Sequence, residues 1–190
     1  MATPSQSGPD KTGGEVLIVL LRGINVGGKH KLPMALLRQT CEALACTDVT
    51  TYIQSGNVVL RSSKAPAEIA AELESALDAA VGFTPRVVTR TAAELARVLA
   101  TNPYPEAEHA KLLIGFMNRR PAQEFIDALR DFDVSPEEYT IVGTEIYLHY
   151  IEGVGTSKRL AKLPLHRLGV EITARNLRTV NKLLDLATAS

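Results

Sequence analysis

The sequence predicts an α+β protein built from two ferredoxin-like (split βαβ, alpha-beta plait) units with antiparallel sheets. The order strand, helix, strand, strand, helix, strand, followed by one more helix, is expected twice along the chain. Each half contains one tight hairpin signal, at 55–56 and at 143–144. A proline-rich break at 102–105 separates the halves. This element order is the one that forms a split βαβ sandwich.

We therefore expect three parts along the chain: a disordered tail over 1–14, a first ferredoxin-like domain over 15–102 and a second over 103–190. The tail is rich in Pro, Ser, Gly and Thr and offers little apolar surface to bury. No residue-level repeat is convincing between the halves, so any duplication rests on the order of the elements.

In the first half, the apolar stretch 15–21 is typical of a strand buried on both sides. Pro33 suits the first turn of a helix. Gly82 ends a second helix, and Thr91 with Glu94 forms a capping box for a third. The expected strands are 15–21, 49–54, 57–61 and 86–90, and the expected helices run from 33, from 66 to 81 and from 91 to about 100.

The second half repeats this order. A basic amphipathic helix is expected over 157–168, although Pro164 interrupts it. The other expected elements are strands over 111–117, 139–142, 145–150 and 170–173, and helices over 121–132 and 176–187.

Composition favours a soluble cytoplasmic protein. The formal net charge is zero and 45% of residues are hydrophobic, so bulk charge predicts neither a nucleic-acid nor a membrane partner. Charge is nevertheless segregated, because 155–190 is basic and 121–153 is acidic. The early apolar run 16–21 is too short to span a bilayer. Cys41 and Cys46 lack a metal-binding spacing, so we expect two reduced structural thiols, no metal and no cofactor.

The loop 22–31 concentrates glycines and cations between a strand and a helix. Gly23, Gly28 and Lys29 have the spacing of a Walker A phosphate loop, but His30 stands where a magnesium-binding hydroxyl belongs. The expected helix also begins several residues late, so a nucleoside triphosphatase is disfavoured.

Two interpretations of this loop remain open. In one, backbone N–H groups together with Arg22, Lys29 and Lys31 bind an anion. In the other, the glycines only permit unusual backbone angles, and the lysines are solvated.

The topology places this loop beside the turn 54–57. In a split βαβ unit, the end of the first strand lies at the same edge of the sheet as the hairpin between the second and third strands. The turn itself has three interpretations: an ordinary hairpin turn, a recognition site that uses the Gln54 and Asn57 amides, or a nucleophile at Ser55 activated by His30. No carboxylate partner for His30 is identifiable, which disfavours the last.

The segment 173–176 is expected to open the last helix, with Thr173 or Asn176 as its cap. Arg175 would then lie in the first turn, where a cation opposes the helix dipole. Either a carboxylate elsewhere in the fold or an anionic ligand would compensate. Arg178 and Lys182 extend the same cationic face.

These motifs resemble those of a widespread bacterial family, DUF1697. The resemblance rests on 21–29 (LRGINVGGK), 33–34, 51–59 (TYIQSGNVV), 102–103 and 173–176 (TARN) with 179–180, and it extends from about residue 15 to the C-terminus. It implies paired alpha-beta plait domains and brings no activity, cofactor or catalytic residue. Leu177 stands where the resemblance leads us to expect an aromatic ring, so a stacking role is not expected at that position.

Our leading hypothesis is a module that binds an anionic or phosphate-bearing ligand, a nucleotide or a nucleic acid. The alternatives are a metal-independent enzyme that holds its substrate with Arg22, Asn25, Gln54 and Asn57, and a structural or subunit-interface protein. The expected ligand-binding residues are Arg22, Gly23, Asn25, Gly27, Gly28, Lys29, Gln54, Ser55, Gly56, Asn57, Arg175 and Asn176.

Overall fold

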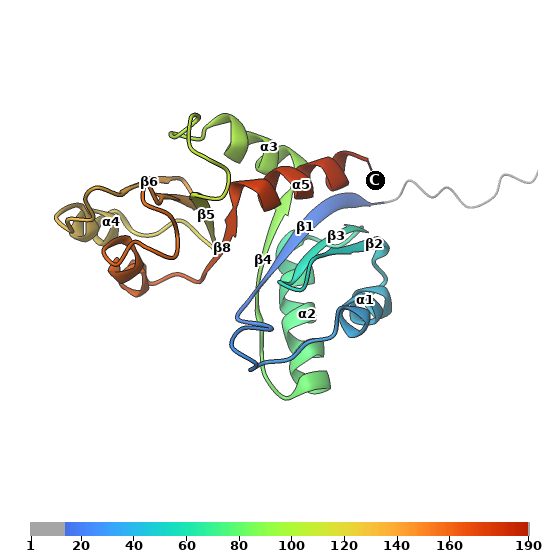
Figure 1. Cartoon of the computed structure of the whole chain (residues 1–190). Helices are drawn as coiled ribbons and strands as arrows, with labels where there is room; N and C mark the ends of the chain where they lie inside the picture. Colours follow the sequence, from blue (N-terminus) through green and yellow to red (C-terminus); the bar gives the residue numbers. More distant parts are fainter. Residues whose placement is uncertain (1–13, 190) are drawn as a thin grey trace, which may run out of the picture.

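The computed structural model describes residues 14–189 and contains two four-stranded antiparallel sheets (Figure 1). The first sheet has the order β2-β3-β1-β4, and helices α1 and α2 cover one of its faces. Its elements are β1 (Glu15–Arg22), α1 (Met34–Ala43), β2 (Thr47–Tyr52), β3 (Asn57–Ser62), α2 (Pro66–Val81) and β4 (Arg86–Thr91). The strand order is that of a ferredoxin-like unit, as the sequence predicted.

The second sheet repeats this order as β6-β7-β5-β8. Its elements are β5 (Leu112–Met117), α4 (Gln123–Arg130), β6 (Glu138–Val142), β7 (Glu145–His149), the 3-10 helices η1 (Leu160–Lys162) and η2 (Leu165–Leu168), and β8 (Ile172–Asn176). Two further helices, α3 (Ala92–Ala100) and α5 (Leu177–Thr188), follow the last strand of each unit. The α+β class and the two ferredoxin-like halves are thus confirmed.

The expected helix over 157–168 is wrong. Two short 3-10 segments occupy this region, and Pro164 lies between them. A proline lacks the N–H that a continuous helix needs, and it disfavours helical angles at the preceding residue. Leu163 accordingly has an extended ψ of 123°.

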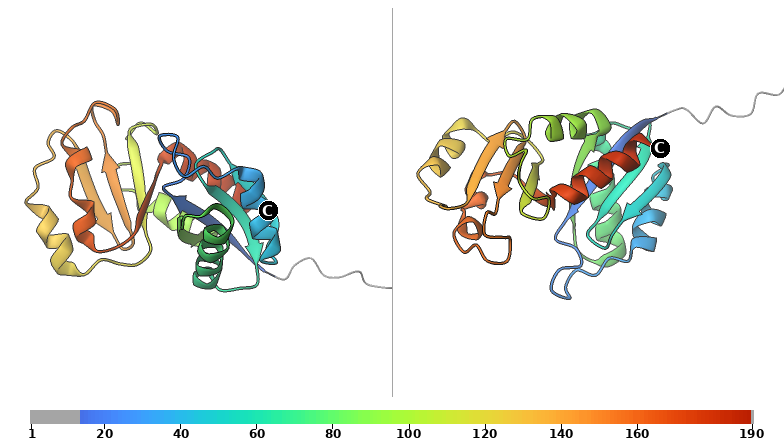
Figure 2. Two further views of the ribbon diagram at one scale, coloured as in Figure 1. Left: turned by 90° about the horizontal axis from the view of Figure 1, so that it is seen from below. Right: turned by 45° about the horizontal axis from the view of Figure 1, so that its top comes forward.

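A core shared by the two units lies between the sheets. Helices α3 and α5 run alongside each other within it (Figure 2). Ile18 and Leu20 of β1 face this core, whereas Leu17 and Val19 face α1 and α2. Phe116 and Tyr147 of the second sheet complete it from the other side. Strand β1 is therefore buried on both faces, as its unbroken apolar sequence predicted.

Side-chain caps fix where α3 and α5 begin. The Thr91 hydroxyl accepts a hydrogen bond from the Glu94 N–H at 3.1 Å, and the Glu94 carboxylate accepts one from the Thr91 N–H at 2.8 Å, which is the predicted capping box. Asn176 accepts from the Thr179 N–H at 2.8 Å. Both helices therefore start directly at the end of a strand, β4 or β8.

The structure does not test the expected tail or the expected domain limits. The expected tail, 1–14, lies outside the described residues except for Gly14, whose carbonyl accepts a hydrogen bond from Arg61 at 2.8 Å. The domain limits after 14 and 102 stay predictions. No helix within residues 14–189 is both long and apolar enough to cross a membrane. Over the same residues, no group of three or more His, Cys, Asp or Glu side chains is arranged to hold a metal ion.

Both cysteines are buried free thiols, with 1% of Cys41 and 5% of Cys46 exposed. Burial, with smaller contributions from the neighbouring Cys46 and Glu42, raises the pKa of the Cys41 thiol to about 12. Burial also raises the pKa of Cys46. Because the thiolate is the reactive form, both thiols are unreactive in the folded protein.

We predict that Cys41 resists Ellman's reagent at pH 8 until the protein unfolds. In a Cys46→Ala variant, the rate should be at least about a hundredfold slower in buffer than in concentrated urea, because the folded thiol is both covered and protonated. Free cysteine measured in both solutions provides the control. Equal rates after that correction would contradict the buried position.

Candidate functional site

The loop after β1 forms a small hairpin. The Lys29 N–H donates to the Val26 carbonyl at 3.1 Å, and the Asn25 N–H donates to the His30 carbonyl at 3.0 Å. Between them, Gly27 and Gly28 have φ values of 58° and 73°, as the central residues of a type I′ turn require. These two glycines are therefore explained by backbone conformation, and Lys29 is exposed beside them.

Asn25 joins this hairpin to the turn between β2 and β3. Its Nδ2 donates to the Leu32 carbonyl at 3.0 Å and to the Gln54 carbonyl at 2.9 Å, and its Oδ1 accepts from the Leu32 N–H at 2.9 Å. The two loops are thus neighbours, as the topology predicted. Both functional ends of the Asn25 amide are engaged with the main chain, whereas the Gln54 side chain is exposed.

Ser55 and His30 are engaged with different partners. The Ser55 hydroxyl accepts a hydrogen bond from Asn57 Nδ2 at 2.9 Å. The His30 ring packs against Phe83, with 4.7 Å between ring centroids, and its Nδ1 lies 3.1 Å from the Gly23 carbonyl oxygen. This arrangement gives no support to a Ser55–His30 nucleophile pair.

Arg175 lies in the penultimate position of β8, so its expected place in the first turn of the last helix is wrong. Its guanidinium crosses into the first unit, where Nη2 donates to the Leu21 carbonyl at 2.8 Å and to the Ser55 carbonyl at 3.0 Å. Its Nε donates to Asn57 Oδ1. Only 9% of Arg175 and none of Asn57 is exposed.

Burial lowers the pKa of Arg175 to about 10, which is still far above neutral pH. The guanidinium is therefore charged, and main-chain carbonyl dipoles and the Asn57 amide replace its hydration. The remaining Nη1 donates to Thr173 Oγ1 and to the Ala174 carbonyl, each at 2.8 Å. Arg175 and Asn57 thus bind each other at the joint between the units, whereas Asn176 caps α5.

Arg90 makes the reciprocal contact. It holds the penultimate position of β4 and crosses into the second unit, where Nε donates to Glu145 at 2.9 Å and Nη2 donates to the Met117 carbonyl at 2.8 Å. Glu145 begins β7 just as Asn57 begins β3. Likewise, Met117 is the last residue of β5, and Leu21 is the last apolar residue of β1. Each unit therefore inserts one arginine into the equivalent corner of the other.

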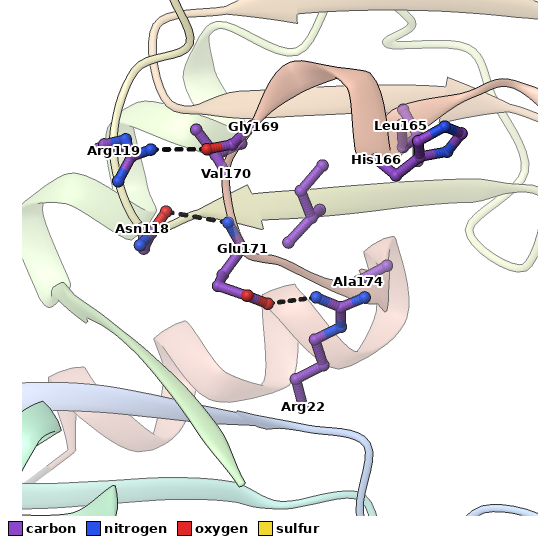
Figure 3. A pocket seen from close by; sticks show the side chains of 10 residues that line it. Arg22, Asn118, Arg119, Leu165, His166, Gly169, Val170, Glu171 and Ala174 are labelled. Atoms are coloured by element: carbon purple, nitrogen blue, oxygen red, sulfur yellow. Dashed lines mark hydrogen bonds and ion pairs between the residues drawn. The ribbon is translucent and has the colours of Figure 1, made fainter. Parts of the chain in front are cut away.

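A cleft lies next to this joint, between the end of β1 and the second unit. Its volume is about 600 Å³, larger than a neighbouring hollow of about 420 Å³ beside Phe83. Figure 3 shows Arg22 entering from the first unit toward Glu171, with Asn118 and Arg119 from the loop after β5 on the facing side. The cleft is lined by Arg22, Asn118, Arg119, Leu165, His166, Gly169, Val170, Glu171, Ile172 and Ala174.

Arg22 and Glu171 form an ion pair across the cleft, with 50% and 40% of their side chains exposed. The main chain of Glu171 is fixed by Asn118: the Glu171 N–H donates to Asn118 Oδ1 at 3.1 Å, and its carbonyl accepts from the Asn118 N–H at 3.1 Å. Arg119 donates to the Gly169 carbonyl at 2.6 Å. Two guanidinium groups and one imidazole thus share the cleft with a single carboxylate.

Of the expected site residues, only Arg22 lines this cleft; Asn25, Gly28 and Gln54 line a separate shallow hollow. Sequence reasoning missed Asn118, Arg119, His166 and Glu171. One signal was available, because 118–120 (NRR) directly follows β5 and Arg22 is the last residue of β1, and the two units have the same element order. Glu171 and His166 carried no comparable signal, since they come from an irregular segment.

A family model described as "Protein of unknown function (DUF1697)" matches residues 15–147, well over half of the chain. The chain belongs to the DUF1697 family. The matched range includes Arg22, the glycine hairpin and the turn 54–57, whereas Arg175 lies beyond it. The family's description names no activity.

A solved structure has a similar fold. The conserved bacterial protein SP0830 from Streptococcus pneumoniae is similar to this DUF1697 chain at a TM-score of 0.73 and 25% identity. The alignment covers 91% of this chain and 98% of that one. No curated protein matches the chain.

We predict that replacing Arg175 with methionine lowers the free energy of unfolding by about 3 kcal/mol or more, because it removes the guanidinium that donates to the Leu21 and Ser55 carbonyls and to the buried Asn57 amide oxygen. Arg175→Lys should not rescue it, since one ammonium cannot reach the acceptors of a planar guanidinium. Urea unfolding measures the loss. Exposed Arg178→Met is the matched control and should change stability by about 0.5 kcal/mol or less. A loss as small as the control's would show that the joint does not depend on Arg175.

We also predict that Gly56→Ala destabilises the protein by about 1–3 kcal/mol more than Gly27→Ala. Both glycines have positive φ, 71° and 58°, so both variants carry the backbone cost. A Cβ on Gly56 would lie 2.7 Å from Leu21 Cβ and 2.8 Å from Ile24 Cδ1, whereas nothing lies within 4 Å of one on Gly27. Denaturant midpoints compare the two directly, and equal losses would refute the close packing at Gly56.

Proposed function

We propose that this protein binds an anionic, phosphate-bearing small molecule in the cleft between its two units. The observation that carries the proposal is that Arg22, Arg119 and His166 line one cleft whose lining includes a single carboxylate, Glu171. Guanidinium groups are well matched to phosphate oxygens, because their N–H groups form a planar fork.

The shape of the cleft supports a small molecule as the ligand. About 600 Å³ is within the usual range of ligand pockets, roughly 300–1,000 Å³. Leu165, Val170 and Ile172 supply an apolar side against which the uncharged body of a ligand can pack. A nucleotide or a sugar phosphate fits this combination better than a long nucleic acid does, since the chain has no net charge.

The glycine hairpin supports this proposal because it places further cationic residues near the cleft. Arg22 and Gly23 also line the adjoining hollow beside Phe83, together with His30. Lys29 and Lys31 are exposed on the same hairpin. The first unit therefore offers a cationic approach to the cleft, which favours the arrival of an anion. Arg175 and Asn57, in contrast, stabilise the joint that keeps the two sides of the cleft together.

We predict a thermal shift on adding nucleoside monophosphates or sugar phosphates at low salt. A ligand present at one hundred times its dissociation constant adds about 2.7 kcal/mol, which corresponds to roughly 5–10 °C for a chain of this size. Arg22→Ala and Arg119→Ala should each weaken binding by about tenfold or more, because each removes a guanidinium that donates charged hydrogen bonds to the ligand.

Arg86→Ala is the matched control. Arg86 is opposite Arg22 in the β1–β4 pairing and is similarly exposed, but it pairs with Glu74 and does not line the cleft. Its loss should leave binding unchanged. A flat screen with folded protein, or equal losses in all three variants, would overturn the proposed site.

A further inference from the structure

We infer that the ligand's phosphate takes the place that the Glu171 carboxylate now holds on Arg22, and that the ligand is a phosphomonoester, whose terminal phosphate is a dianion. This inference rests on the proposed function and names the ligand class and the contact that selects it. The Arg22–Glu171 pair is the observation from which it starts.

Breaking the Arg22–Glu171 pair should cost the protein little stability. The pair joins the two units across the cleft, yet half of the Arg22 side chain and 40% of the Glu171 side chain remain in contact with solvent. Exposed ion pairs contribute little to stability. Breaking the pair therefore costs little, in contrast to the buried Arg90–Glu145 pair, in which 9% and 11% of the side chains are exposed.

Glu171 can turn away from Arg22, but it cannot leave the cleft. Two hydrogen bonds of 3.1 Å tie its main chain to Asn118, and it directly precedes β8. After exchange, its negative charge stays near the incoming anion and repels it. The ligand must consequently bring more negative charge to Arg22 than a carboxylate does.

A phosphomonoester meets this requirement and a phosphodiester does not. The monoester carries close to two negative charges at neutral pH, and three terminal oxygens are free to accept from a guanidinium fork. With Arg22 and Arg119 opposed only by Glu171, the lining has one net positive charge before His166 is counted. A diester carries one charge, the same as the carboxylate that it would have to displace.

The apolar side of the cleft sets the orientation. Arg22 and Glu171 lie toward the first unit, whereas Leu165 and His166 come from η2 on the far side of the cleft (Figure 3). A phosphate on Arg22 therefore directs the rest of the molecule toward Leu165 and Ile172. A compact ester with an uncharged, partly apolar body fills this space.

The test compares phenyl phosphate with methyl phenyl phosphate, which differ by one methyl group and one charge, by isothermal titration calorimetry on the full chain. Wild-type protein should bind the monoester about tenfold more tightly than the diester. Glu171→Gln should bind the monoester about fivefold more tightly than wild type, because the competing carboxylate is gone. Adding Arg22→Ala to Glu171→Gln should abolish that gain, and melting curves without ligand establish that each variant is folded.

The outcomes separate this inference from the proposed function. Equal monoester affinity in wild type and folded Glu171→Gln would overturn the exchange while leaving phosphate binding in the cleft intact. Equal affinity for monoester and diester would overturn the ligand class. If neither compound binds to either protein, the proposed function and this inference both fail.

Discussion

The structure depends on two arginines that cross between its halves. Arg175 reaches from β8 to the corner where β1 ends and β3 begins, and Arg90 reaches from β4 to the corresponding corner of the second sheet. Each is more than 90% buried. A charged group in that position is tolerated only when hydrogen-bond acceptors surround it. The two contacts therefore fix the positions of the strand ends at these corners and the placement of one unit against the other.

The cleft is a consequence of this joint. Arg22 follows directly after Leu21, whose carbonyl is bound by Arg175, so the end of β1 faces the second unit in a defined position. On the other side, Asn118 follows Met117, whose carbonyl is bound by Arg90. The Arg175 and Arg90 contacts thus position both sides of the cleft. Arg175 and Asn57, which the sequence marked as ligand-binding, bind each other at this joint, and Arg22 and Ala174 beside them line the cleft.

Much of the fold was predictable because it is encoded locally. The unbroken apolar run of β1, the hairpin turns and the Thr91 capping box each specify one element, and their repeated order specifies the ferredoxin-like topology. The same topology predicted that the hairpin around Asn25 lies beside Gln54. The helix expected over 157–168 does not form, because Pro164 lacks the N–H that a continuous helix needs.

The proposed site was harder to predict, because the residues that line the cleft come from both units. Nothing in the local sequence distinguishes the buried Arg175, which donates to carbonyls, from the exposed Arg22, because the two differ in the tertiary contacts around them. A crystal structure of the protein soaked with phenyl phosphate tests the account most directly. We expect the phosphate on the Arg22 guanidinium, Glu171 turned away, and the Arg175–Asn57 contact unchanged. A phosphate bound at the 25–30 hairpin or on Arg175, with the Arg22–Glu171 pair intact, would contradict it.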